Sequence, residues 1–378
     1  MTPSDLPAGL GLELPLAWTD TIATSTALWR ADVRRRRFLV SAVFTSAAAP
    51  SSALRWLTSP PAAAPASAGT RRVGTADIDA VRELTRSYRE IDNKLGGGKI
   101  RGVVVSYLDE HVSGLLTDGT YSETAGRELA AACGELCQLA GWVAYDSDEH
   151  GLAQRYLTQA LAYARHADDQ ALAAEILAAQ AHQALYLARP AEGADLARAA
   201  QAAATRRGSA TLLTECQVME AHAHAARNDA PACGTALARN APFDLAARDD
   251  DPGWLSYFDE AYLAARMAQC FRDLGDSRHA VRYARRSLDM DGRYVRGRAF
   301  GLSLLATAHA AAGEPEEATR VGRQALDLTA RLNSARSVRY PRDLTRQLRP
   351  RADLPAVRDF TAEVRDRLPA AAGPAGFR

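Results

Sequence analysis

The chain has 378 residues, of which 46 are basic and 45 acidic, so its formal net charge is +1. This balance gives no overall electrostatic reason to expect nucleic acid or an anionic membrane as a partner. Apolar residues make up 47% of the chain and aromatic residues only 7%. That composition predicts alanine-rich helices that approach one another closely, and it does not suit a core of bulky rings.

Residues 1–57 form an N-terminal arm in which Ile22, Leu28, Trp29 and Val33 predict one amphipathic helix. The helix runs into a basic stretch made of Arg34, Arg35, Arg36 and Arg37. With the following Phe38-Leu39 and a weakly apolar run, this stretch resembles a twin-arginine export signal, which implies export of the folded protein. The other interpretation is a solvated basic helix that meets a partner or the acidic surface of the protein itself.

The next segments connect the arm to the predicted helical repeats. Residues 58–74, rich in Pro, Ala and Ser, are predicted to be a linker with too little apolar bulk to pack. Residues 75–121 are predicted to form capping helices, the first opening at Thr75 and ending at Gly96-Gly-Gly98. One face of this first helix is marked by Ile78, Val81, Leu84, Tyr88, Ile91 and Leu95.

A helix-turn-helix pattern returns through residues 122–345. Its recurring small residue stands at Ala153, Gly193, Cys233, Ala280 and Ala318, and subtraction gives spacings of 40, 40, 47 and 38. Such a period predicts stacked helical hairpins, since each hairpin buries its apolar face only against its neighbours. Residues 346–368 are predicted to form a C-terminal capping helix, followed by a disordered tail over 369–378.

This pattern resembles the tetratricopeptide repeat, which pairs two helices and keeps small residues at fixed positions. The resemblance implies an all-α, right-handed solenoid whose first helices line a groove. The family's groove positions, carried over unit by unit, correspond to Gln138, Trp142, Tyr145, Glu175, His182, Glu215, His222, Tyr262, Gln269 and Arg272. Rings and a few charges among alanines suit a peptide, a partner protein or a small-molecule signal. For Trp142 and Tyr145 the alternative is packing against the capping helices.

Several strings span nearly the whole chain: 30–39, 54–57, 138–142, 151–156, 182–186 and 270–275. They resemble the C-terminal regions of actinobacterial regulators that join an Xre-type helix-turn-helix to a tetratricopeptide-like domain. In that group a DNA-binding domain precedes the arm, whereas here Met1 is followed by a stretch too rich in Pro and Gly for a helix-turn-helix. The resemblance implies a regulator that acts through protein contacts. The alternative is a DNA-binding regulator whose helix-turn-helix is missing from this gene model, and DNA is a partner only in that case.

No catalytic signature is found in the sequence, so we predict a protein that is not an enzyme and needs no cofactor. Gly96-Gly-Gly-Lys99 ends like a phosphate-binding loop but lacks its first glycine and its Ser or Thr. Cys133 and Cys137 share a helix face without a second ligand pair, and His222 and His224 point apart, so no metal site is predicted. The odd count of five cysteines favours a reducing cytoplasm over a disulfide framework. A homodimer is left open.

Overall fold

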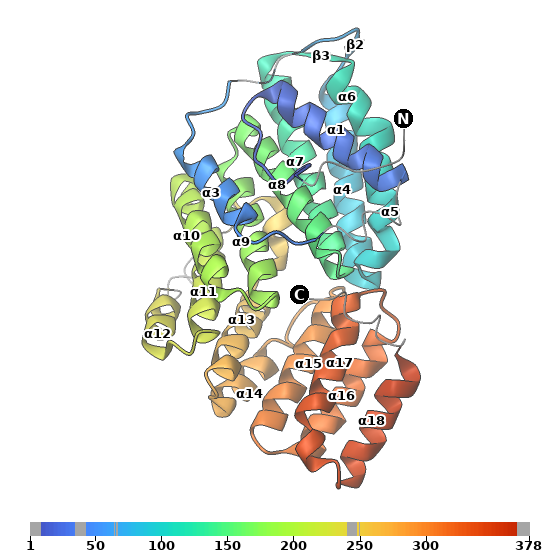
Figure 1. Cartoon of the computed structure of the whole chain (residues 1–378), viewed down its shortest axis with the longest axis vertical. Helices are drawn as coiled ribbons and strands as arrows, with labels where there is room; N and C mark the ends of the chain where they lie inside the picture. The colour runs from blue at the N-terminus through green and yellow to red at the C-terminus, as the bar shows by residue number, and fades with distance from the viewer. Residues whose placement is uncertain are drawn as a thin grey trace. The chain divides into compact units, whose positions relative to one another are not determined.

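The structure, a computed structural model, describes residues 9–34, 43–63, 65, 67–239, 248 and 250–368. These residues confirm the predicted all-α fold, because helices dominate and the strands are two or three residues long (Figure 1). The N-terminal elements are α1 (Trp18–Arg34), α3 (Ala48–Thr58), β1 (Ser67–Ala68), β2 (Arg71–Arg72), α4 (Thr75–Leu95), α5 (Gly97–Tyr107), the π-helix η1 (Leu108–Val112), α6 (Ser113–Thr117) and β3 (Gly119–Tyr121).

The helical repeats follow in pairs. They are α7 (Glu123–Asp146) with α8 (His150–Ala167), α9 (Gln170–Tyr186) with α10 (Pro190–Arg207), α11 (Ala210–Ala225) with α12 (Ala230–Ala238), α13 (Glu260–Asp273) with α14 (Ser277–Arg286), and α15 (Val295–Ala311) with α16 (Pro315–Thr329). The 3-10 helix η3 (Gly253–Tyr257) stands between α12 and α13. The chain then adds α17 (Ala335–Gln347), the short η4 (Arg349–Arg351) and α18 (Pro355–Arg367).

The chain divides into two compact units. Unit 1 comprises residues 1–92 and 97–258, and unit 2 comprises residues 93–96 and 259–378. Consecutive helices of each hairpin pack against each other within these units, as in α7 with α8 and α15 with α16. The helices of the two units are described separately.

The recurring small residue has the same structural place in every hairpin. Ala153, Gly193, Cys233, Ala280 and Ala318 are each the fourth residue of the second helix, and all five are buried. The backbone N–H of each donates to the carbonyl of the residue just before that helix, as Ala153 does to Glu149 at 3.0 Å. A small side chain is needed here because the helix start lies against the preceding helix. A Cβ on Gly193, for example, would lie 2.9 Å from a carbon of Leu185.

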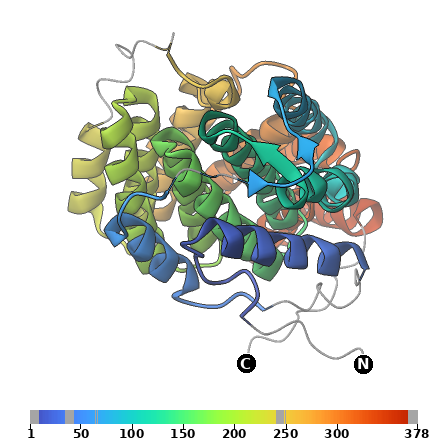
Figure 2. The same cartoon turned by 90° about the horizontal axis from the view of Figure 1, so that it is seen from above.

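The N-terminal arm belongs to the core of unit 1. In α1, Leu28 and Trp29 are fully buried, as the predicted amphipathic helix requires, and α1 lies against α5 and α8. The second arm helix, α3, packs on α8 and α10, and Figure 2 shows both arm helices lying across the repeat helices. Arg34 is exposed at the end of α1. Arg35, Arg36 and Arg37, and with them the twin-arginine-like motif, fall outside the described residues, as do residues 369–378.

The prediction of an unpacked linker over 58–74 is wrong for its second half. Ser67 and Ala68 pair antiparallel with β3, and Arg71 and Arg72 pair parallel with it, so β3 is the middle strand of a small sheet. Val73 is 4% exposed. Composition alone missed this because the pairing partner, residues 119–121, comes about fifty positions later and supplies the hydrogen bonds.

The apolar face predicted for α4 is only partly buried. Ile78 and Val81 are fully buried, but Ile91 is 38% exposed and Leu95 is 45% exposed. In the second half of the helix the polar Asp92 is buried instead. The helical period therefore located the buried face of α4 correctly only over its first turns, because the neighbouring helices cover a different face further along.

Candidate functional site

The first helices of the hairpins in unit 1 bring the predicted groove residues together. Gln138 on α7 donates from Nε2 to Oε1 of Glu175 on α9 at 3.2 Å. Its own Oε1 accepts a hydrogen bond from Arg89 of α4 at 2.8 Å. Two turns further along the same helices, the Tyr145 hydroxyl and His182 Nδ1 share a hydrogen bond of 2.8 Å. The repeat spacing thus placed α7 and α9 in the correct register.

Glu175 is joined to Glu215 of the next hairpin by a residue that sequence reasoning missed. The hydroxyl of Tyr257, in η3, lies 2.8 Å from Oε2 of Glu175 and 2.7 Å from Oε1 of Glu215. The two glutamates are 4% and 2% exposed. Burial raises the pKa of Glu175 above its ordinary value, although the hydrogen bond from Tyr257 and the charge of Arg89 oppose that shift. Tyr257 stands outside the repeat pattern, so no periodic signal could have pointed to it.

Aromatic rings form the other half of this row. Trp142 contacts Tyr145 and His182 edge-on with centroids 5.5 Å apart in both cases. Tyr145 also meets Tyr186 edge-on at 5.4 Å and lies 5.7 Å from His150. Trp142 is half-buried while Tyr145 is 1% exposed. We call the unit 1 set Gln138, Trp142, Tyr145, Glu175, His182, Glu215 and Tyr257 the polar row.

Most of the polar row is buried. Gln138, Tyr145, Glu175, His182 and Glu215 are all less than a tenth exposed, whereas Trp142 keeps partial exposure. The predicted groove residue His222, on α11 and outside the polar row, is also partly exposed. This differs from the open surface expected from the groove positions, because the side chains satisfy one another and Tyr257 covers the two carboxyl groups. The alanines beside these residues allow this close packing, because their small side chains let the first helices approach one another. Ligand binding at these residues stays a prediction.

The predicted residues of unit 2 are organised around an arginine that was not predicted. Arg266 on α13 is 7% exposed and donates from Nη2 to the Tyr262 hydroxyl at 2.7 Å and from Nη1 to Oε1 of Gln269 at 3.0 Å. Its guanidinium also lies 4.8 Å from the Tyr262 ring centroid. Arg272, on the same helix, is paired with the adjacent Asp273. A signal for Arg266 was present, since it stands four positions after Tyr262.

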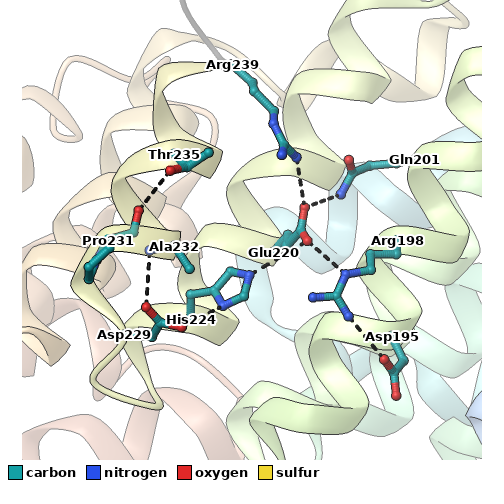
Figure 3. Close-up of polar contacts among 10 residues, drawn as sticks. All are labelled: Asp195, Arg198, Gln201, Glu220, His224, Asp229, Pro231, Ala232, Thr235 and Arg239. Carbon is teal, nitrogen blue, oxygen red and sulfur yellow. Dashed lines mark hydrogen bonds and ion pairs between the residues drawn. The ribbon is translucent and has the colours of Figure 1, made fainter.

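A second polar cluster joins α10, α11 and the end of α12 (Figure 3). The carboxylate of Glu220 accepts hydrogen bonds of 2.9 Å from both Arg198 and Gln201, and Arg239 pairs with it at 3.4 Å. Burial opposes ionisation here, but the hydrogen bonds from Gln201 and Arg198 hold the pKa of Glu220 below its ordinary value. Nε2 of His224 lies 3.7 Å from the same carboxylate. The cluster ties three helices together.

Polar side chains of α8 bind main-chain groups from two segments of the N-terminal arm, one before α1 and one after it. Gln154 accepts from the backbone N–H of Thr45 at 2.9 Å and donates to its carbonyl at 2.8 Å. Arg155 Nε donates to the carbonyl of Leu10 at 3.0 Å. Gln159 donates to Gly11 at 3.2 Å, and Arg165 donates to Leu16 at 2.9 Å. We call Gln154, Arg155, Gln159 and Arg165 the arm-binding face; the sequence showed these residues only as part of a repeat helix.

A buried ion cluster also holds α1, the first helix of the arm. Asp32, fully buried on α1, accepts 2.8 Å hydrogen bonds from Arg101 of α5 and from the hydroxyl of Tyr156 on α8. Arg101 also pairs with Glu149, and burial, opposed by Arg101, raises the pKa of Glu149. Asp32 belongs to the string 30–39 and Tyr156 to the string 151–156, so two of the resembling strings meet at this cluster.

The chemistry of thiols and metals is limited in the part of the chain that the structure describes. All five cysteines are buried free thiols, and burial raises the pKa of Cys133, Cys137 and Cys216. Among the described residues, no group of three or more His, Cys, Asp or Glu is arranged to hold a metal ion. Within the same residues, no helix is both long and apolar enough to cross a lipid bilayer.

Comparison with known proteins gives no match, either to a protein-family model or to a curated protein.

Proposed function

We propose that this protein is a non-enzymatic regulatory protein whose helical repeats hold a peptide, a partner protein or a small signal. The observation that supports binding of a peptide is the arm-binding face. Four side chains of one repeat helix hold main-chain groups of two separate segments of the arm, at Leu10, Gly11 and Leu16 and at Thr45, through hydrogen bonds that do not depend on the bound side chains. Recognition of main-chain groups is a common way for proteins to bind peptides.

The part of the polar row at Trp142 is the place that we propose for the external ligand. Trp142 is its half-exposed ring, and rings of this type supply contact area at low entropic cost. The transcriptional or developmental setting rests on the resemblance of the quoted strings to actinobacterial regulators. The five buried free thiols fit a reducing cytoplasm, which we propose as the compartment.

The test uses the full chain with a photo-crosslinking phenylalanine analogue at position 142, and the same analogue at the exposed Val103 as control. We expect a partner that is captured from position 142 and not from position 103. In the unlabelled chain, Trp142→Ala should weaken pull-down of that partner at least tenfold without changing the far-ultraviolet circular dichroism spectrum. Arg323→Ala, at a partly exposed arginine of unit 2, should retain it. Equal capture from both positions, or pull-down that survives Trp142→Ala, would contradict the proposal.

A further inference from the structure

Helix α14 of unit 2 carries a row of arginines and no acidic residue. Its four arginines, all exposed, are Arg278, Arg282, Arg285 and Arg286, and we call them the arginine stripe. Successive members stand four, three and one positions apart, so they lie along one side of a helix that turns once in 3.6 residues. The negative end of the helix dipole favours the last two, but it does not favour Arg278 in the first turn. Like charges at these spacings also repel one another.

The stripe differs from the other exposed arginines in its lack of acidic partners. In several other helices an exposed arginine pairs with an acid three residues earlier, as Arg320 of α16 does with Glu317 at 2.7 Å. Arg286 has only a distant partner, Glu260, at 4.0 Å. Among the residues that the structure describes, none forms a hydrogen bond or an ion pair with the side chains of the other three members. The stripe therefore leaves most of its N–H donors open.

An aromatic cluster holds part of the stripe in place. The guanidinium groups of Arg282 and Arg286 lie 5.8 and 5.6 Å from the ring centroid of the half-buried Tyr283. That ring stacks on Phe271 of α13 with centroids 5.3 Å apart, and Phe271 also stacks on His279 at 5.0 Å. A cation–π contact restrains an arginine without using its N–H donors. A restrained donor loses less conformational freedom when it binds an acceptor.

The charges beside the stripe decide which class of anion fits it. Glu260 is 71% exposed next to the stripe, Asp276 precedes the first turn of α14, and Asp289 is exposed beyond its last turn. A nucleic acid presents its phosphates over a broad surface, so it would also meet these carboxylates. A narrow ligand with its negative charges in one row would meet the arginines alone. An acidic helix has this geometry, because Glu or Asp at spacings of three and four residues share one face.

We propose that the arginine stripe binds an acidic helical segment of a partner protein, whose carboxylates accept hydrogen bonds from the guanidinium groups. Such hydrogen bonds are strengthened by charge on both sides. Because the stripe is exposed, salt screens them and weakens the complex. The stripe belongs to unit 2 and Trp142 to unit 1, so this proposal does not rest on the function proposed above.

The test is fluorescence anisotropy of the full chain with a labelled alanine-rich peptide that carries glutamates in one row. A length of about twenty residues allows the peptide to form a helix. We expect binding at about 50 mM salt and weaker binding at about 200 mM. Arg278→Gln combined with Arg282→Gln should weaken binding about tenfold. Arg346→Gln combined with Arg365→Gln removes two arginines of unit 2 that are 73% and 76% exposed and paired with acids, and it should keep binding unchanged.

Three further ligands, each added to the wild-type chain, separate charge from its arrangement. The peptide with glutamine in place of glutamate should not bind, and a peptide with its glutamates spread around the helix should bind more weakly. A DNA duplex of the same length as the peptide should also bind more weakly than the row of glutamates. The proposal is overturned if the row peptide fails to bind at up to about 1 mM, or if both glutamate peptides bind equally. Unchanged binding by the stripe variant also overturns it, and tighter binding of the duplex assigns the stripe to nucleic acid instead.

Discussion

The two units use the same helical hairpins but place their charges differently. In unit 1, buried polar side chains join segments far apart in the chain, as Asp32 and Arg101 do across 69 positions. In unit 2, many ion pairs join residues within a turn of one helix and stay exposed, as Arg346 and Asp343 do. A buried pair contributes to how segments dock because either partner alone is costly, whereas an exposed pair is screened by water. The buried pair in unit 1 therefore contributes to how its segments assemble.

The largest expected effect is at the Asp32 cluster. Asp32→Ala leaves the buried Arg101 with one carboxylate fewer, and breaking a buried pair costs about 3–5 kcal/mol. We expect the calorimetric transition of unit 1 to fall in temperature while that of unit 2 is unchanged. Asp195→Ala, which removes a carboxylate 66% exposed, is the control and should leave both transitions in place. A loss below about 1 kcal/mol in Asp32→Ala would show that the cluster does not hold the arm.

The second effect concerns acid. Burial, helped by the charge of Arg165, lowers the pKa of His166 from its ordinary value to about 4. The unfolded chain therefore binds more protons between about pH 6.5 and about 4, and the stability of unit 1 falls as pH drops through this range. The free energy of unfolding, measured with urea at several pH values in this range, should depend less steeply on pH in His166→Gln than in wild type. Parallel curves would mean that burial does not keep His166 neutral in the folded state.

The third effect, that of adding a methyl group where two helices lie close together, is expected in both units. It therefore tests what the two units have in common. A Cβ at Gly141 would lie 2.8 Å from Leu157, and one at Gly322 would lie 2.8 Å from Leu344. Overpacking costs about 1–3 kcal/mol, against about 1 kcal/mol gained in helix propensity by Gly→Ala. We expect Gly141→Ala and Gly322→Ala to lower the free energy of unfolding of their own units by up to about 2 kcal/mol each. Gly234→Ala, where a Cβ meets nothing within 4 Å, should be neutral or stabilising.

The smallest effect is expected at a surface pair of unit 2. Arg323 and Glu363 are 2.8 Å apart, with side chains 35% and 36% exposed. Exposed pairs contribute about 0–1 kcal/mol, so Arg323→Ala should change the free energy of unfolding by no more than about 0.5 kcal/mol. Measurement in low and high salt should give the same value within error. A loss comparable to that of Asp32→Ala would remove the contrast between the units.

Part of the polar row was predictable from sequence. Gln138 and Glu175 stand at matching positions of consecutive first helices, so a correct repeat register was enough to bring them together. The burial of Glu175 was not predictable, because its cover is Tyr257, which comes from a 3-10 turn outside the repeat. The arm-binding face was missed for a similar reason. Glutamine and arginine on a helix usually meet water, and only the arm's position turns Gln154 and Arg155 toward main-chain groups.

The sequence by itself determined the hairpins, since a small residue at the fourth position of each second helix is a local requirement for close helix contact. Composition and period also determined the all-α class. Only the tertiary structure decided that the chain forms two units, that residues 67–73 join a small sheet, and that the arm completes the core of unit 1. These outcomes depend on contacts between residues about fifty to one hundred and fifty positions apart, and no periodic pattern along the chain encodes which distant segment will supply a buried hydrogen-bond partner.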